Sequence, residues 1–214
     1  MLRGCEDLIH GLAIQGDLLL SGEGGGNKKG SSGGKARLWS LSSLECNAVY
    51  AEHSASVLGV ALGQSVVISA SYDTTARVWR PNPSNEGEMA SLWTMRHPAA
   101  VQSVSVDSGL GIAATGCGDG RARIWSLAKR TCLIKLEHSS IGLPLSCVRL
   151  LHGVLVSGGD ETVKVWCLKG RSANGDPECI ATFSHGANVK GVGISKNGFV
   201  ASAGGNILAV WQAS

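Results

Sequence analysis

Tryptophan recurs along this chain at a nearly constant spacing, and this repeat constrains the fold more than any other feature. Five nonamers end in tryptophan, and their last residues are Trp39, Trp79, Trp125, Trp166 and Trp211. The intervals between them are 40, 46, 41 and 45 residues. Four histidines precede their tryptophans by 26 or 28 residues: His53, His97, His138 and His185. Self-similarity at such a period indicates an architecture of repeated structural units.

Each period divides into short runs that are typical of β-strands. The second period contains VLGVAL (57–62), VVISAS (66–71), TARVWR (75–80) and MASLWTM (89–95), and the third and fourth periods divide in the same way. The runs are rich in valine and isoleucine and are bounded by Gly, Asp, Ser and Asn. Because the connections are too short for parallel crossovers, each unit is predicted to be an antiparallel sheet of four strands. The predicted fold class is therefore all-β.

Composition excludes several kinds of protein. The net charge is only +3, and the 19 Lys and Arg residues are scattered, which does not favour nucleic-acid binding. No apolar run is long enough to span a membrane, and the N-terminal residues do not resemble a secretory signal. The seven cysteines form no CxxC pair, so we expect buried free thiols in a reducing compartment, the cytoplasm or the nucleus.

These recurring residues resemble those of the WD-repeat β-propellers, typified by the β subunit of heterotrimeric G proteins. The shared marks are the histidine before the first strand, the Ser or Thr ending the second, the turn aspartate and the tryptophan of the third. The aspartate that follows tryptophan in the family is absent, because these positions hold Ser40, Arg80, Ser126, Cys167 and Gln212. The resemblance implies one propeller domain over residues 1–214, with repeats at about 5–52, 53–96, 97–137, 138–184 and 185–214.

The family also implies a hydrogen-bonded chain of Trp, Ser or Thr, His and Asp inside each repeat. By position this structural network contains Trp79, Ser69, His53 and Asp73 in the second repeat, and Trp125, Thr115, His97 and Asp119 in the third. The fourth repeat keeps Trp166, His138 and Asp160, with Ser157 shifted by one residue. The fifth keeps Trp211 and His185 but has Gly205 in place of aspartate. The first keeps Trp39 but has Gly33 and no histidine in phase, and its His10 aligns with Leu58.

Blade number stays open at this stage. Five repeats are visible and the last is incomplete, whereas most members of the family close with seven blades. Either a five-bladed ring closes imperfectly, or the chain is part of a larger ring of the seven-bladed type. We favour the larger ring.

Three further patterns have both a structural and a functional interpretation. Ser, His and Asp together suggest a hydrolase, but the set recurs in successive repeats and no GxSxG elbow is present, so we favour the structural role. The glycine-rich run 22–35 fits neither a P-loop nor GxGxxG, and it is interpreted as a lengthened turn, with an adaptable contact loop bearing Lys28 and Lys29 as the alternative. The basic residues two positions before tryptophan are expected to pack along the sheets with their charged ends in solvent, or less readily to bind a polyanion: Arg37, Arg77, Arg123 and Lys164.

The resemblance implies a non-enzymatic scaffold that presents its loops to protein or peptide partners within a larger assembly. The candidate contact residues, by alignment, are His10, Leu58, Tyr72, Gln102, Ser146, Asn188 and Lys190. No catalytic residue, cofactor, metal or small-molecule substrate is expected, and neither membrane insertion nor a nucleic-acid partner. The alternative is the substrate-recognition propeller of an SCF-type ubiquitin ligase, since hairpins such as GVLVSGGDETVKVW look like those of F-box/WD-repeat proteins. Against it, the chain has no F-box segment and no arginine cluster for phosphate capture.

Overall fold

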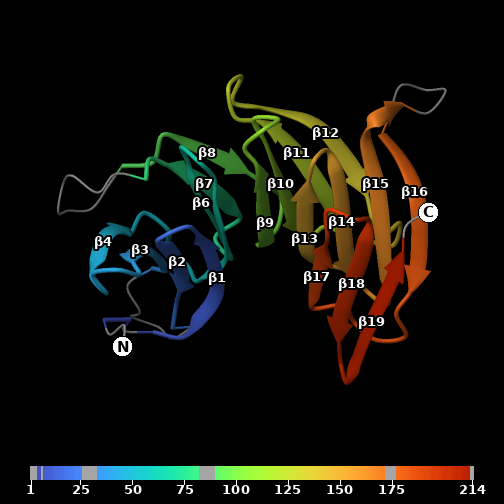
Figure 1. The fold of residues 1–214 in the computed structure, drawn as a ribbon, viewed down its shortest axis with the longest axis horizontal. Helices are drawn as coiled ribbons and strands as arrows, with labels where there is room; N and C mark the ends of the chain where they lie inside the picture. Colours follow the sequence, from blue (N-terminus) through green and yellow to red (C-terminus); the bar gives the residue numbers. More distant parts are fainter. Residues whose placement is uncertain (1–3, 6, 26–32, 82–89, 172–176, 213–214) are drawn as a thin grey trace. The chain divides into compact units, whose positions relative to one another are not determined.

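Short runs of β-branched residues form antiparallel strands throughout the computed structural model, which describes residues 4–5, 7–25, 33–81, 90–171 and 177–212. Within these ranges the strands make five separate sheets, each joined in up-and-down order along the chain (Figure 1). We number them sheet 1 to sheet 5. The all-β prediction is confirmed. None of the segments that the structure describes is a helix long and apolar enough to cross a membrane.

The strands of each sheet follow one another in the sequence. Sheet 1 contains β1 (Ile9–Gln15), β2 (Leu18–Glu23), β3 (Lys35–Ser40) and β4 (Cys46–Tyr50). Sheet 2 contains β5 (Val57–Leu62), β6 (Val67–Ser71), β7 (Thr75–Trp79) and β8 (Trp93–Arg96). Sheet 3 contains β9 (Val101–Asp107), β10 (Ile112–Cys117), β11 (Arg121–Ser126) and β12 (Thr131–Glu137). Sheet 4 contains β13 (Leu145–Leu151), β14 (Val154–Gly159), β15 (Thr162–Arg171) and β16 (Pro177–Ser184). Sheet 5 has three strands, β17 (Gly191–Ile194), β18 (Phe199–Gly204) and β19 (Ile207–Gln212).

The chain divides into two units, residues 1–104 and residues 105–214, and each is described by itself. In the first unit, sheets 1 and 2 bury a shared core between them. Leu20, Ala36 and Leu38 of sheet 1 pack against Val57 and Trp79 of sheet 2. Trp79 is fully buried, which contributes about 2–3 kcal/mol to folding.

The second unit contains two cores of the same kind. Between sheets 3 and 4, Ala122 and Ile124 pack with Leu145 and Trp166. The core between sheets 4 and 5 contains Val156, Val163, Val165, Val189 and Val200. Because a single sheet has no partner for its apolar face, sheets 1 and 2 stabilise each other in the first unit, and sheet 4 is stabilised by sheets 3 and 5 in the second.

The pairing between the second and third strands has the same register in all five sheets. Each tryptophan lies directly opposite an apolar residue of the second strand: Leu19–Trp39, Val67–Trp79, Ala113–Trp125, Leu155–Trp166 and Val200–Trp211. Two residues further along the second strand, on the same face, stands a hydroxyl residue: Ser21, Ser69, Thr115, Ser157 and Ser202. The fold therefore places a hydroxyl within reach of each of these five indole rings.

Candidate functional site

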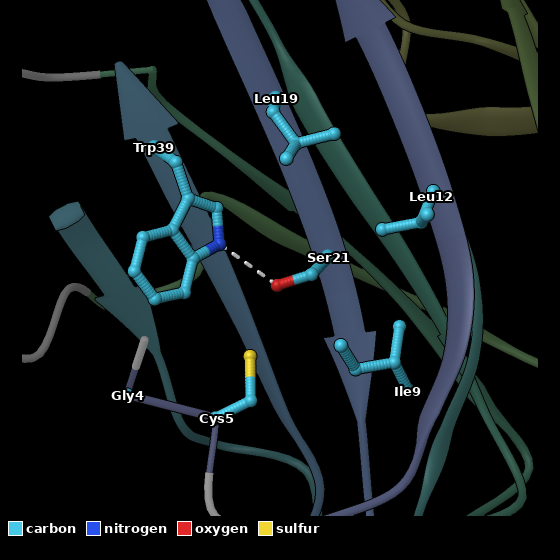
Figure 2. A pocket seen from close by; sticks show the side chains of 7 residues that line it. All are labelled: Gly4, Cys5, Ile9, Leu12, Leu19, Ser21 and Trp39. Atoms are coloured by element: carbon cyan, nitrogen blue, oxygen red, sulfur yellow. Dashed lines mark hydrogen bonds between the residues drawn. The ribbon is translucent and has the colours of Figure 1, made fainter. Parts of the chain in front are cut away.

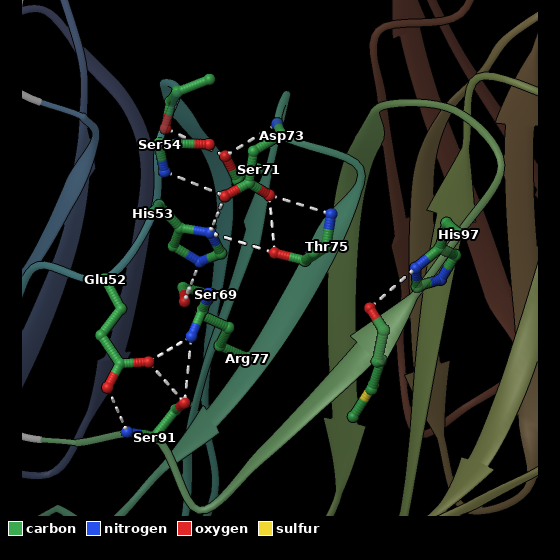
Figure 3. Close-up of polar contacts among 12 residues, drawn as sticks. Glu52, His53, Ser54, Ser69, Ser71, Asp73, Thr75, Arg77, Ser91 and His97 are labelled. Atoms are coloured by element: carbon green, nitrogen blue, oxygen red, sulfur yellow. Dashed lines mark hydrogen bonds and ion pairs between the residues drawn. The ribbon is translucent and has the colours of Figure 1, made fainter.

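Sheet 2 contains the complete polar network that the sequence predicts, and Figure 3 shows the part of it formed by His53, Ser69 and Asp73. The indole N–H of Trp79 donates to Ser69 Oγ at 2.8 Å, and Ser69 Oγ lies 2.7 Å from Nε2 of His53. On the other side of the ring, Nδ1 of His53 lies 2.8 Å from the Asp73 carboxylate. Asp73 also accepts bonds from the backbone and hydroxyl of Thr75 at 2.9 and 2.6 Å. The network connects His53, in the segment before β5, to the hairpin formed by β6 and β7.

The same network has the order of a catalytic triad but lacks access for a substrate. Ser69 is fully buried and His53 is 2% exposed. The Ser69 hydroxyl accepts from Trp79 and forms a second hydrogen bond with His53, so it is held by two buried partners. Burial alone would raise the pKa of Asp73, but its bonds from His53 and Thr75 lower the pKa to about 2. The geometry supports a structural role.

Sheet 4 has the same hydroxyl–indole bond despite a shorter turn. Trp166 donates to Ser157 Oγ at 2.8 Å, and Nδ1 of His138 lies 2.9 Å from the same oxygen. Ser157 is one residue closer to its tryptophan in sequence than Ser69 is, because the hairpin turn is one residue shorter. The other ring nitrogen of His138 lies 3.2 Å from the Gly159 carbonyl, not opposite the predicted Asp160 carboxylate.

The shorter turn explains why Asp160 does not take the place of Asp73. Asp160 has φ of 52°, in the left-handed region that the tight turn requires. Gly205 of sheet 5 has φ of 56° at the corresponding place. In sheet 5, His185 bonds Ser202 Oγ at 2.7 Å and the Gly204 carbonyl at 3.4 Å. A backbone carbonyl thus replaces the carboxylate where the turn is short, and glycine at position 205 is accommodated.

Sheet 3 differs from the prediction in the partner of its aspartate. Trp125 donates to Thr115 at 2.9 Å, as in the other sheets. Asp119 forms a two-pronged ion pair with Arg123, with distances of 3.1 and 2.5 Å. Burial alone would raise the pKa of Asp119, but the bonds from Arg123 lower it to about 2. His97 belongs to the other unit, where its Nδ1 lies 3.2 Å from the Met95 carbonyl.

Sheet 1 replaces the missing histidine with a thiol and a buried ion pair, which sequence analysis did not find. Trp39 donates to Ser21 at 2.9 Å. Since Ile9 and Val57 pair at equivalent positions, Cys5 stands four residues before the strand, where His53 stands in sheet 2. Figure 2 shows Cys5, Ser21 and Trp39 around one cavity. Burial and the Glu23 carboxylate raise the pKa of the Cys5 thiol.

The carboxylate of Glu23 is almost completely buried and pairs with Arg37 at 2.5 Å. The basic residues two positions before tryptophan were expected to have their charged ends in solvent. This prediction is wrong for Arg37 and Arg123, whose side chains are 12% and 7% exposed and ion-paired. Arg77 bonds Glu52 and Ser91, and Lys164 lies over the Trp166 ring at 5.7 Å. The carboxylates paired with Arg37, Arg77 and Arg123 leave these three arginines unsuited to a polyanion track.

Three candidate contact residues of the first unit lie at one level on neighbouring first strands. His10 and Leu58 are each the extra residue of a β-bulge, where pairing jumps from Ile9 to Gly11 and from Val57 to Gly59. A Cβ at Gly11 would lie 3.1 Å from the Leu58 carbonyl, and one at Gly59 would lie 3.2 Å from the Gln102 carbonyl. Glycine therefore allows these strands to approach closely. His10 is exposed and also bonds the Gly24 carbonyl at 3.0 Å.

The remaining candidate contacts are mostly accessible. Tyr72 is 52% exposed at the turn after β6. In the second unit, Ser146 is the bulge residue of β13 and is half-buried, while Asn188 and Lys190 are exposed before β17. A bulge turns a side chain away from the regular alternation of a strand, so Ser146 can present its hydroxyl beyond the sheet. Whether they touch a partner stays a prediction.

Other sequence predictions have mixed outcomes. Cys117 and Cys147 are buried, whereas Cys46 and Cys179 are exposed, so the expectation of buried thiols is wrong for the latter two. Lys28 and Lys29 lie outside the described residues. Across the described ranges, no group of three or more His, Cys, Asp or Glu side chains could hold a metal ion.

Ser21, Ser202 and Cys5 are not among the network residues that the sequence predicts, because their distances from tryptophan differ from those in the second and third repeats. Both serines stand two residues after the second-strand residue that pairs with tryptophan, and Cys5 stands four residues before the first residue of β1. The buried Glu23–Arg37 pair has no such signal in the sequence.

Comparisons with known proteins agree with this geometry. The family model described as WD domain, G-beta repeat matches residues 44–80 and 90–126. The probable E3 ubiquitin ligase complex SCF subunit sconB of Penicillium rubens is 40% identical over 52 residues, which cover 24% of this chain and 8% of that protein. Transducin beta-like protein 3 of Rattus norvegicus is 28% identical over 135 residues, which cover 59% of this chain and 16% of that protein.

Solved structures show the same fold. U3-55K matches with a TM-score of 0.81 at 18% identity, covering 99% of this chain and 63% of that one. The WD40 repeats of RRP9 match with a TM-score of 0.80 at 18% identity, covering 100% of this chain and 62% of that one. The chain thus spans less than two thirds of each of these neighbours and a small part of the curated relatives.

Proposed function

This chain contains WD repeats, matched over residues 44–80 and 90–126, and on that premise we propose that it is a non-enzymatic scaffold whose sheet ends bind protein or peptide partners. Members of the family generally act in this way. The chain therefore holds partners in an assembly and changes no covalent bond. Exposed thiols at Cys46 and Cys179 fit a reducing compartment, and we propose the cytoplasm or the nucleus.

The observation that carries the proposal is the row formed by His10, Leu58 and Gln102 on adjacent first strands. Two of the three are bulge residues, and the strands carrying them are held in close contact by glycine. Side chains that bulges direct away from rigid strands form a fixed surface, and a fixed surface lowers the entropic cost of binding. The row combines an imidazole, an aliphatic group and an amide, and this mixture suits a peptide more than a nucleic acid.

The proposal of a non-enzyme is supported by how the polar groups are used. His53, Ser69 and Asp73 are buried and hydrogen-bonded to one another. The same hydroxyl–indole bond recurs in sheets 1, 3 and 4. A group repeated in successive sheets stabilises the fold, whereas an active site is normally single.

A second candidate is substrate recognition within an SCF-type ubiquitin ligase. It is favoured by the 52-residue match to sconB, although that match covers a small part of that protein. Phosphate capture would need unoccupied arginines, and Arg37, Arg77 and Arg123 each pair with a carboxylate. These three arginines are therefore not available to bind a phosphate group.

Affinity capture from native extract tests both proposals. The wild-type chain is compared with a variant carrying His10→Ala and Tyr72→Ala, and with Leu133→Ala as a matched control at an exposed position of β12. We expect the first variant to lose proteins that the wild type and the control retain. Cullin-ligase subunits among the retained proteins would favour the second candidate. Equal recovery with all three chains would refute the proposed contact surface.

A further inference from the structure

One face of sheet 1 has no protein partner among the described residues of its unit. On the face that carries Trp39, Ile9, Leu12 and Ile14 of β1 are 51%, 62% and 67% exposed. Together with Cys5 and Leu19, several of these residues line an open cavity of about 290 Å³, shown in Figure 2. Exposed apolar side chains gathered around a cavity mark a surface that something covers.

The equivalent positions are buried in sheets 2 and 4, each of which packs on a preceding sheet. In sheet 2, Val57 and Val60 correspond by register to Ile9 and Leu12, and they are 0% and 8% exposed. In sheet 4, the equivalents Leu145 and Val148 are 0% and 5% exposed. They are covered by small and branched apolar residues from the third strand of the preceding sheet, such as Ala36 and Leu38 for sheet 2. The bare face of sheet 1 is therefore one half of an interface that the molecule already uses.

The other half of the same kind of interface is exposed on sheet 5, among the described residues of its unit. Leu208 and Val210 of β19 correspond by register to Ala36 and Leu38 of β3. Ala36 and Leu38 are 0% and 1% exposed, whereas Leu208 and Val210 are 76% and 62% exposed.

Neither bare strand carries the charges that usually protect exposed strands. The sequences of β1 and β19 are IHGLAIQ and ILAVWQ, without Lys, Arg, Asp or Glu. By contrast, the exposed strand β12 carries Lys135 and Glu137. Charged residues on exposed strands prevent unwanted association, so their absence from β1 and β19 fits strands that are covered.

We propose that the Ile9, Leu12 and Ile14 face of sheet 1 binds the Leu208 and Val210 face of sheet 5 from a second copy of this chain. A second copy carries the complementary face on its sheet 5. Leu208 and Val210 stand there at the positions that Ala36 and Leu38 occupy in the interface between sheets 1 and 2. The contact is head to tail, since the two surfaces differ, and each copy can both give and accept it. Leu208 and Val210 would occupy the cavity beside Leu19 and Trp39 as Ala36 and Leu38 pack beside Val67 and Trp79.

Light scattering on the purified 214-residue chain tests the proposal. The wild type is expected to have the mass of two or more copies, and Leu12→Asp and Leu208→Asp are each expected to be monomeric. Leu133→Asp, at an exposed apolar residue of β12, is the control and should keep the wild-type mass. Circular dichroism and a thermal melt identify any variant that fails to fold, and Val210→Asp then replaces Leu208→Asp.

Mixing the two blocked variants gives the sharper result. Leu12→Asp retains an intact sheet 5 face, and Leu208→Asp retains an intact sheet 1 face. Their equimolar mixture should therefore regain a complex of twice the monomer mass, whereas neither variant alone associates. A monomeric wild type, whether its faces are covered from within the chain or left bare, would overturn the proposal. So would a mixture that stays monomeric, or a self-associating wild type whose mass neither variant changes.

Discussion

Replacing Asp73 by asparagine should destabilise the first unit by a predictable amount. The carboxylate accepts from His53 at 2.8 Å, from the backbone of Ser54 at 3.1 Å, and from the backbone and hydroxyl of Thr75 at 2.9 and 2.6 Å. An asparagine side chain keeps one acceptor oxygen and turns an N–H₂ group toward one of these donors. A buried donor without an acceptor costs about 1–3 kcal/mol.

The pKa of Asp73 gives an independent magnitude. It falls from 3.8 to about 2 on folding, and each pKa unit corresponds to about 1.4 kcal/mol. The charged form therefore contributes about 2 kcal/mol, in agreement with the estimate from hydrogen bonds. Because the folded pKa is depressed, this stability is fully present above pH 3.8 and is lost as the pH falls toward about 2.

Asp160→Asn is the matched control, because in sheet 4 the Gly159 carbonyl faces the histidine ring in place of a carboxylate. Urea unfolding followed by tryptophan fluorescence, with amide hydrogen exchange over residues 67–79, measures both variants. We expect a loss of about 2 kcal/mol for Asp73→Asn and less than about 0.5 kcal/mol for Asp160→Asn. Equal losses in the two variants would refute the reasoning, as would an unchanged acid sensitivity of sheet 2 in Asp73→Asn.

Three further predictions concern the second unit and the thiols. Ser157→Ala should cost about 2 kcal/mol in urea unfolding, because it leaves the buried Trp166 N–H without its acceptor; a loss below about 0.5 kcal/mol would contradict this. Burial lowers the pKa of His138 below 6.5, so the unfolded chain takes up its proton first and stability should decline as the pH falls below 6.5; a ring that titrates at or above 6.5 by NMR would contradict this. Burial raises the pKa of Cys147 from 9.0 to about 12, so this thiol should react with a thiol reagent about a thousandfold more slowly than the exposed Cys46 and Cys179, as mass spectrometry of labelled peptides would show; equal labelling in the folded chain would refute its burial.

Much of the fold could be predicted because its signals are local. The run 57–62 became β5 over the same residues, and the run 75–80 became β7 with one residue fewer. Alternating apolar residues and turn residues are enough to place such strands. The fourth strand of sheet 2 was less predictable: the expected run 89–95 became β8 over Trp93–Arg96.

The details of the site could not be predicted by spacing alone. Asp160 was expected to replace Asp73, but a turn shorter by one residue gives it a left-handed conformation and leaves a carbonyl facing His138. The partner of Arg123 depends on side-chain rotamers across the Asp119 turn, which no sequence period encodes. Register is set by strand pairing, whereas the polar partners are set by turn geometry, and only the first repeats regularly.

The constant register of the central hairpins has a practical consequence for engineering. Glu23 pairs with Lys35 although eleven residues separate them in the chain, while Gly159 pairs with Thr162 across two. Since the closure entropy of a loop grows only as the logarithm of its length, the free-energy difference between such connections is about 1–2 kcal/mol. The segment between β2 and β3 is therefore a suitable place to graft an epitope or a reporter peptide, because the strands on either side keep their alignment whatever is inserted between them.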